Sequence, residues 1–384
     1  MKFFFRRLSM IFLFGCIALS VSAQVHVTFL VKQASVKHIN DSVFLAGNFN
    51  NWVPSDKRYA IKTNNKGASR INAKFPPGNY KYKITRGSWD KVETTINGDD
   101  IDDRTFNLKK DTTIYITVPA WKDEFKSKPV VRRHTASWHV SVMDTAFEMP
   151  QLNSKRRIWI YLPDDYAASD MKFPVLYMHD GQNLFDEYTS GFGEWGVDEY
   201  LDSAFKKGAK ECIVVGIDND PVHRMNEYNP YFFAQFGKGD GNAYVDFLAK
   251  TLKPYIDAHY RTLRNKSNTF IAGSSMGGLI SLYAVLKYPE VYGGAGIFSP
   301  AFWTASGIEK DVNGFSGKVN SKLFFYAGGN ESDKMVPDMQ RIEKDIKSNS
   351  KSAIVEVVDP PAQHNETAWR KHFSEFYQWM MNQQ

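Results

Sequence analysis

The chain has 384 residues, 43% of them hydrophobic and 15% aromatic, which is enough apolar material for sizeable cores and, at this length, for two domains. Its formal net charge of +6 at pH 7 falls to +3 without the three basic residues among the first 23. A balance this close to neutral argues against nucleic acid as a partner.

Residues 1–23 predict a secretory signal. They begin with a positively charged segment, continue through an apolar stretch at residues 10–17 and end in small residues before Gln24. We therefore expect cleavage before Gln24 and export to the periplasm or the outside of the cell. The apolar stretch is too short for a membrane span. A weaker alternative is lipoprotein anchoring at Cys16, which would leave an apolar mature start. Cleavage before Gln24 removes Cys16 and leaves Cys212 without a disulfide partner in the rest of the chain.

Residues 24–120 predict a small all-β, immunoglobulin-like sandwich. Apolar and polar residues alternate in short segments, for example at residues 25–32, 80–85 and 114–118, and turn-forming clusters separate these segments. Short strands at this spacing are typical of a sandwich of two antiparallel sheets.

Two segments of this region, residues 46–52 and 82–89, resemble the glycogen- and starch-binding-type sandwich modules. The resemblance implies that Trp52 and Trp89 are platforms for the apolar face of a sugar and that Lys83 donates to a hydroxyl group. It makes a polysaccharide an expected partner of the module. The asparagine-bearing strand of sugar-binding members is replaced here by Asp-Asp-Arg at residues 102–104, so a docking or spacer module with core tryptophans is the alternative.

Residues 121–134, rich in Lys, Arg and Asp, are the expected linker, and residues 135–384 are the second expected domain. From Gly208 onward, apolar runs alternate with helical stretches. This pattern is typical of a mainly parallel sheet flanked by helices.

The most informative segment of the second domain is the glycine-rich stretch around Ser275. Residues 273–277 read Gly-Ser-Ser-Met-Gly, a short apolar run precedes them at residues 269–272, and a helical pattern follows at residues 278–286. Strand, sharp turn and helix form the context in which such a serine is a nucleophile on an exposed elbow. The alternative is a plain glycine-rich turn between a strand and a helix.

A nucleophilic serine needs an imidazole base and a carboxylate that orients the imidazole. In α/β-hydrolases these partners follow in the order serine, acid, histidine, and only His364 and His372 follow Ser275. His372 lies in a C-terminal amphipathic pattern, whereas His364 lies in a loop after a strand, so we assign His364 as the base. For the acid we favour Glu331, with Asp333 as the alternative, because both follow an apolar strand.

An oxyanion hole needs two backbone N–H groups. One is expected from Met276, which follows the nucleophile, and the other from Gln182, in a glycine-containing loop after a buried strand at residues 173–178. A helix N-cap turn is the alternative role for that loop. Asp180, in the same loop, is assigned to substrate binding.

Trp303 and Arg224 are further candidates for substrate binding, because each follows the end of a predicted strand. Burial in the core is the alternative for Trp303. For Arg224 we favour a structural ion pair with Glu227 that holds the loop.

Several of these segments together resemble the enterochelin-esterase-like hydrolases, a family that includes feruloyl and acetyl-xylan esterases (carbohydrate esterase family 1) and mycolyl acyltransferases. The similarity spans roughly residues 135–382 and rests on the segments 177–186, 194–198, 273–278, 299–303 and 364–366. It implies an α/β-hydrolase fold with no metal and no cofactor, and it places Ser275, Glu331 and His364 at the family's catalytic positions.

Together these features predict an exported serine carboxylic-ester hydrolase that works through an acyl-enzyme. The expected substrates are acetyl or feruloyl esters of polysaccharides, or a siderophore ester, because the same fold and triad serve different esters. Two alternatives remain: an acyltransferase of the same fold, and a non-catalytic glycan-binding protein.

Overall fold

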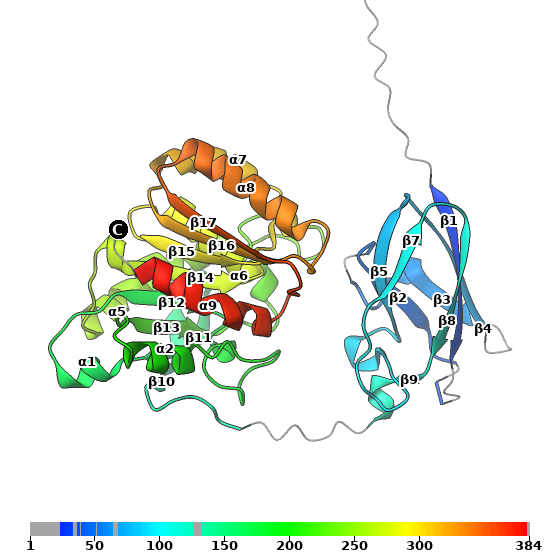
Figure 1. The fold of residues 1–384 in the computed structure, drawn as a ribbon, viewed down its shortest axis with the longest axis horizontal. Coiled ribbons are helices and arrows are strands. Elements are labelled where there is room, and N and C mark those ends of the chain that lie inside the picture. Colours follow the sequence, from blue (N-terminus) through cyan, green and yellow to red (C-terminus); the bar gives the residue numbers. More distant parts are fainter. Residues whose placement is uncertain are drawn as a thin grey trace, which may run out of the picture. The chain divides into compact units, whose positions relative to one another are not determined.

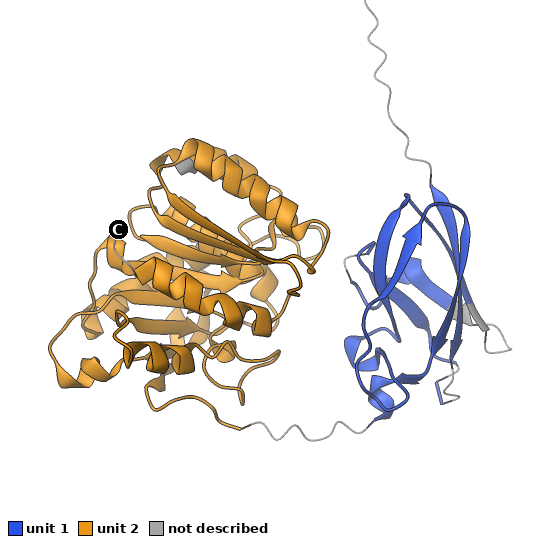
Figure 2. Ribbon diagram, in the orientation of Figure 1, with its two compact units in different colours: residues 1–130 blue, residues 131–384 orange. Residues whose placement is uncertain are grey.

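The computed structural model describes residues 24–33, 37–38, 40–50, 52–63, 68–125 and 133–381. The predicted signal with Cys16 and the central part of the predicted linker lie outside these residues. The chain divides into two compact units, residues 1–130 and residues 131–384 (Figure 2).

The described part of the first unit contains strands and short 3-10 helices (Figure 1). Seven strands form hydrogen-bonded neighbours in the order β7-β5-β2-β3-β4-β1-β8, and a small pair joins β6 to β9. β1 and β8 run parallel, whereas the other neighbours are antiparallel. The strands are β1 (Val25–Gln33), β2 (Val43–Gly47), β3 (Ala60–Thr63), β4 (Ala68–Phe75), β5 (Gly78–Thr85), β6 (Glu93–Thr94), β7 (Arg104–Leu108), β8 (Thr112–Val118) and β9 (Ala120–Trp121).

Strands from opposite ends of this order share one core. The ring of Phe29 on β1 contacts Tyr82 of β5 at 5.5 Å and Phe106 of β7 at 5.6 Å between centroids, although β1 is not paired with either strand. The strands therefore lie in two layers with apolar side chains between them, as the alternation of apolar and polar residues in β1 requires.

The packed part of the first unit extends beyond residue 120. Trp121 is fully buried in its core, and residues Lys122–Glu124 form a 3-10 helix. The prediction that the linker begins at residue 121 is therefore wrong, because the burial of an indole outweighs the polar composition of the residues that follow it.

The second unit is built on an eight-stranded sheet in the order β10-β11-β13-β12-β14-β15-β16-β17 (Figure 1). β10 and β11 are antiparallel to their neighbours, and the strands from β13 onward in this order are parallel. The strands are β10 (Val140–Met149), β11 (Ser154–Tyr161), β12 (Val175–His179), β13 (Ile213–Ile217), β14 (Thr269–Ser274), β15 (Gly294–Phe298), β16 (Lys322–Gly328) and β17 (Ala353–Asp359). The mainly parallel sheet predicted from the sequence is confirmed.

Helices cover both faces of this sheet. Alternate strand residues belong to two separate apolar cores, one shared with α4 to α8 and the other with α2 and α9. Burial on both faces explains why the central strands are continuously apolar. The helices are α1 (Asp164–Ala168), α2 (Val197–Phe205), α3 (Arg224–Glu227), α4 (Gly241–Phe247), α5 (Lys253–His259), α6 (Met276–Lys287), α7 (Ile308–Phe315), α8 (Met335–Asn349) and α9 (Glu366–Met381), and a π-helical segment, Leu248–Leu252, joins α4 to α5.

The parallel strands bring distant parts of the sequence to one edge of the sheet. Ser275 follows β14, Ser299 follows β15, Glu331 follows β16 and His364 follows β17. The carboxyl ends of parallel strands meet at the same edge, which is where open α/β sheets hold their sites.

Candidate active site

Ser275 occupies a sharp turn between β14 and α6. Its φ of 59° and ψ of −117° are unusual for a residue with a Cβ, as expected for a strained nucleophile elbow. The turn is held by two hydrogen bonds, from the Ser275 amide to the Phe298 carbonyl at 2.8 Å and from the Ala301 amide to the Ser275 carbonyl at 3.0 Å. β15 and the loop after it therefore fix the position of the serine.

The glycines of the elbow are required by close packing. A Cβ on Gly273 would lie 2.9 Å from Cδ2 of His179, and one on Gly278 would lie 2.7 Å from the Phe298 carbonyl oxygen. Both distances are shorter than a carbon atom tolerates. Glycine at these positions lets the elbow sit against β12 and β15.

Glu331 and His364, which lie after neighbouring strands, are brought into direct contact. Oε2 of Glu331 is 2.6 Å from Nδ1 of His364. The Glu331 side chain is 1% exposed, whereas Asp333 is exposed. Because a carboxylate only accepts hydrogen bonds, Nδ1 of His364 carries the proton and Nε2 is left as the basic nitrogen. This contact favours Glu331 over Asp333 as the partner of the imidazole.

The other carboxylate oxygen of Glu331 is held by two donors that sequence reasoning did not identify. Oε1 accepts hydrogen bonds from the Ser299 hydroxyl and the Gly328 amide, each at 2.6 Å. Ser299 in turn accepts a hydrogen bond from Nε1 of Trp369 at 2.9 Å. Ser299 lay in a segment that carries the family resemblance, but its spacing from Glu331 gave no sign of this contact.

The two expected oxyanion donors lie on turns beside the elbow. Gln182 belongs to a 3-10 helix, Gly181–Asn183, directly after β12, and Met276 begins α6. A Cβ on Gly181 would lie 2.9 Å from backbone atoms of β13, so this turn needs glycine. Within the described ranges, neither the Gln182 nor the Met276 amide donates a hydrogen bond to the protein. Two unpaired N–H groups are what an oxyanion hole requires.

Arg224 pairs with Asp180, so the predicted Arg224–Glu227 pair is wrong. Nε and Nη2 of Arg224 donate to the two Asp180 oxygens at 2.7 Å each, and the Asn219 side chain adds a bond at 2.6 Å. Burial alone would raise the pKa of Asp180, but the Arg224 guanidinium outweighs it and holds the pKa below its ordinary value. Asp180 and Arg224, each predicted to bind substrate, therefore form an ion pair with each other.

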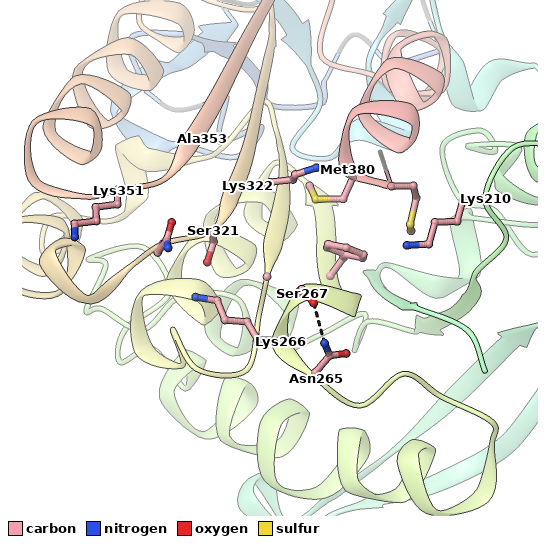
Figure 3. Close-up of a pocket in the computed structure, with 13 residues that line it drawn as sticks. Lys210, Asn265, Lys266, Ser267, Ser321, Lys322, Lys351, Ala353 and Met380 are labelled. Carbon is pink, nitrogen blue, oxygen red and sulfur yellow. Dashed lines mark hydrogen bonds between the residues drawn. The ribbon is translucent and has the colours of Figure 1, made fainter. Parts of the chain in front are cut away.

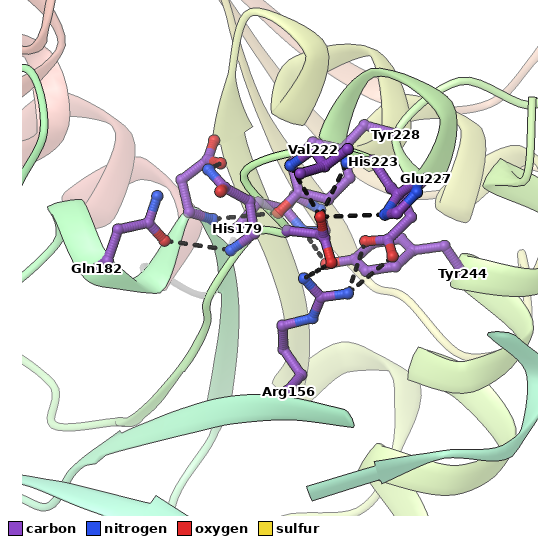
Figure 4. A network of polar contacts seen from close by, with 11 residues as sticks. Arg156, His179, Gln182, Val222, His223, Glu227, Tyr228 and Tyr244 are labelled. Atoms are coloured by element: carbon purple, nitrogen blue, oxygen red, sulfur yellow. Dashed lines mark hydrogen bonds and ion pairs between the residues drawn. The ribbon is translucent and has the colours of Figure 1, made fainter. Parts of the chain in front are cut away.

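Glu227 faces the other way, into the polar network of Figure 4. Its carboxylate accepts from Nη2 of Arg156 on β11 at 2.7 and 3.0 Å. In the same network, Nδ1 of His179 lies 3.0 Å from the Tyr244 hydroxyl, and burial lowers the pKa of His179 to about 3. A histidine that stays neutral and packs against the elbow has a structural role here.

Glu366, at the start of α9, is a buried acid that was not predicted as a site residue. It is 8% exposed, and burial raises its pKa to about 7, helped by the charge of Asp180 and opposed by His364 and Arg224. The sequence signal was its position two residues after the assigned base.

Trp303 is 47% exposed rather than buried in the core. Its ring packs edge to face against Phe233, at 5.6 Å between ring centroids. Phe232, which precedes Phe233 in the chain, is 67% exposed. The alternative of burial in the core is therefore wrong, and the substrate-binding role of Trp303 stays a prediction.

Glu194, Asp198 and Glu199 are acids with oxygens within 4.8 Å of one another, a spacing that could hold a metal ion. Burial and the charge of Glu199 raise the pKa of Glu194 to about 7, and burial raises that of Asp198 to about 6. Two of these acids anchor the start of the second unit: the Thr135 hydroxyl donates to Glu194 at 2.8 Å and the Ser137 amide donates to Asp198 at 2.7 Å. The cluster thus holds the segment that leads into the sheet.

In the first unit, the three residues assigned to glycan binding differ in their exposure and in their contacts with the protein. Trp52 and Trp89 lie 6.4 Å apart between ring centroids, and Trp89 is 42% exposed. Lys83 donates to the Ile101 carbonyl and lies 3.8 Å from the carboxylate of Asp103. Trp89 is therefore accessible and Trp52 is partly buried beside it, whereas Lys83 already contacts the segment that departs from the sugar-binding pattern.

No helix in the described parts of the chain is both long and apolar enough to span a bilayer.

The model of the Esterase family matches residues 149–380. The protein YbbA of Bacillus subtilis is 30% identical over 194 residues, which are 48% of this chain and 72% of YbbA. An endo-1,4-beta-xylanase/feruloyl esterase of Xylanibacter ruminicola is 27% identical over 165 residues, which are 42% of this chain but 22% of that protein. The solved structure of the enterobactin esterase FES of Shigella flexneri has a TM-score of 0.52 at 15% identity, with 92% of each chain covered. At that identity the likeness is one of fold.

Proposed function

The chain belongs to the Esterase family, and from this membership together with the geometry around Ser275 we propose that it is a serine carboxylic-ester hydrolase. The observation that carries the proposal is the 2.6 Å contact between Oε2 of Glu331 and Nδ1 of His364. It lies at the edge of the sheet at which Ser275 follows β14. A strained serine, a histidine and a buried carboxylate that follow in this order are the parts of a hydrolase triad.

In the proposed mechanism, Nε2 of His364 takes the proton of the Ser275 hydroxyl while the oxygen attacks the ester carbonyl. The carbonyl oxygen becomes an oxyanion that accepts from the amides of Met276 and Gln182. The imidazolium gives its proton to the leaving alcohol, and an acyl-enzyme remains on Ser275. Water, deprotonated by the same imidazole, then attacks the acyl carbonyl and frees the acid.

Glu331 orients the imidazole and stabilises its charged form. Its carboxylate cannot turn away, because the Ser299 hydroxyl and the Gly328 amide hold Oε1 while Oε2 faces Nδ1 of His364. This arrangement keeps the proton on Nδ1 and the lone pair on Nε2. No cofactor and no metal take part in these steps.

The substrates we propose are acetyl or feruloyl esters of polysaccharides, or a siderophore ester. Feruloyl ester cleavage is named for the relative from Xylanibacter ruminicola, and enterobactin esterase activity for the structure from Shigella flexneri. Trp303, half-exposed on the loop after β15, offers an aromatic surface for the acyl or sugar part. A panel of acetyl, feruloyl and triscatecholate esters would distinguish these substrates by their kcat/KM values.

The first unit is proposed to be an immunoglobulin-like module that binds polysaccharide through Trp52 and Trp89. The exposed indole of Trp89 and the partly buried indole of Trp52 beside it support this role, because an apolar sugar face stacks on an indole. The protein should be retarded in gels that contain starch or xylan, and replacing both tryptophans by Ala should abolish the retardation. Unretarded migration of the unchanged protein would rule out this role. Export, from the predicted signal at residues 1–23, would bring the module to such a polymer.

The catalytic proposal is tested with Ser275→Ala. The unchanged protein should hydrolyse p-nitrophenyl acetate, and the variant should lose roughly 10³- to 10⁶-fold in kcat while it keeps its melting temperature. The matched control is Ser274→Ala, one residue earlier on β14, which should stay active. An inactive Ser274→Ala with an active Ser275→Ala would show that the elbow is misassigned, and an unchanged protein without turnover would favour a non-catalytic glycan-binding protein.

An acyltransferase of the same fold is the second candidate, since a sugar alcohol could replace water in the last step. Product analysis with and without a sugar acceptor distinguishes the two: hydrolysis releases free acid in both cases, whereas transfer yields a new ester only when the acceptor is present.

A further inference from the structure

A hollow lies at the edge of the second unit's sheet opposite to the one at which Ser275 lies. It has a volume of about 760 Å³ and is formed where β14, β15, β16 and β17 begin, together with the end of α9 (Figure 3). Ser275, Glu331 and His364 follow the other ends of these strands. The hollow is therefore separate from the proposed catalytic site, and its size is that of a small-molecule site.

Four lysines surround this hollow, and none of the residues that line it is acidic. Lys266 precedes β14, Lys322 begins β16, Lys351 precedes β17 and Lys210 precedes β13, so four separate segments each contribute one ammonium group. Figure 3 shows the four side chains distributed around the space. We call this hollow with its four lysines the basic pocket.

Three of the four ammonium groups lack a partner among the residues that the structure describes. Lys322 donates to the Trp379 carbonyl at 3.2 Å, at the end of α9. Within the described ranges, the ammonium groups of Lys210, Lys266 and Lys351 form no ion pair and no hydrogen bond. Uncompensated like charges around one hollow repel each other, and a bound anion would relieve this repulsion.

The two less exposed lysines respond to this environment. Burial lowers the pKa of Lys266, although the charge of Glu290 opposes the shift. Burial also lowers the pKa of Lys322, and the charge of Lys210 lowers it further. A lysine pKa falls when its charge is poorly solvated or lies near another positive charge, and an anion in the pocket would reverse both effects.

The remaining lining residues suit a polar scaffold that carries anionic groups. Asn265, Asn320, Ser267 and Ser321 supply amide and hydroxyl groups, and Phe270 contributes an apolar surface. Ammonium groups recognise oxyanions by charge, whereas amides and hydroxyls can bond to the hydroxyls of a sugar.

We propose that the basic pocket binds a small molecule with at least two oxyanion groups, such as a sugar that carries phosphates or carboxylates. The site does not depend on the catalytic proposal, because none of its residues belongs to the triad or the oxyanion hole. Its occupation can therefore be measured in a protein that lacks ester hydrolysis.

The test is calorimetric titration of the full chain, at low salt, with inorganic pyrophosphate and separately with citrate. The pocket variant is Lys266→Gln with Lys351→Gln, which spares Lys322 and its bond to α9. The matched control is Lys310→Gln with Lys344→Gln, two exposed lysines on α7 and α8 outside the pocket. We expect saturable one-to-one binding of at least one probe, weakened about tenfold or more in the pocket variant and unchanged in the control.

The relative affinity of the two probes then identifies phosphate or carboxylate as the preferred group. Hydrolysis of p-nitrophenyl acetate should be the same in all three proteins, and Ser275→Ala should bind the probes normally. The proposal is overturned if neither probe binds saturably, or if the control pair loses as much affinity as the pocket pair.

Discussion

Replacing Glu331 by Gln should disable the proposed catalytic site through the tautomer of His364. In the native protein, Oε1 of Glu331 accepts from the Gly328 amide and Oε2 faces Nδ1 of His364. The Gly328 amide can only donate, so the carbonyl oxygen of Gln must take the Oε1 position. The NH₂ group of Gln then points at Nδ1 and donates to it, which forces the imidazole proton onto Nε2.

An imidazole protonated at Nε2 cannot take the proton of Ser275. In serine hydrolases the corresponding change from carboxylate to amide lowers kcat by about 10⁴-fold, which corresponds to about 5.5 kcal/mol of transition-state stabilisation. We expect a loss of this size for Glu331→Gln, with KM nearly unchanged because the side chain does not reach the substrate. Steady-state kinetics on p-nitrophenyl acetate measure both constants, and a thermal melt checks that the variant is folded.

Asp333→Asn is the matched control, because it makes the same chemical change two residues away on an exposed side chain. It should keep kcat within about twofold of the unchanged protein. The reasoning is refuted if folded Glu331→Gln retains more than about a tenth of the native kcat, or if Asp333→Asn is the more damaged variant.

Three further changes probe the surroundings of the site. Gly181→Ala adds a Cβ 2.9 Å from the backbone of β13, so the turn that carries the second oxyanion donor must shift, and kcat should fall roughly 10²-fold; an unaltered kcat would contradict that role. Arg224→Met leaves the carboxylate of Asp180 buried without its cation, and the melting temperature should fall by roughly 6–12 °C. An unchanged melting temperature would contradict a stabilising role for this ion pair. Glu194 has a folded-state pKa of about 7 against an ordinary value of 4.5, so the folded state binds its proton more tightly and stability is lost as the pH rises through 7. Glu194→Gln should therefore melt about 2–4 °C above the unchanged protein at pH 8 and close to it at pH 4.5, after allowance for solvent screening; equal melting at both values would refute the argument.

The local parts of the proposed site follow from the sequence alone. The elbow around Ser275 could be predicted because a strained strand-to-helix turn needs small residues at fixed positions on both sides of the nucleophile. His364 could be selected because only two histidines follow that serine and one of them lies in a helical pattern. Alternating apolar residues likewise predicted strands in the first unit, and continuous apolar runs predicted the parallel strands of the second. Backbone chemistry and burial leave such traces in consecutive residues.

Contacts between distant segments were decided by the tertiary structure. The sequence favoured a pair between Arg224 and the nearby Glu227 that holds a loop, but α3 is a single turn whose two ends face different neighbours, Asp180 and Arg156. The preference for Glu331 over Asp333 remained open for a similar reason, because the path of one loop decides which of two nearby acids turns inward. Ser299, 32 residues before Glu331, left no pattern that predicts its hydrogen bond. Such contacts depend on how whole strands align in the sheet, and a pattern of neighbouring residues does not encode that alignment.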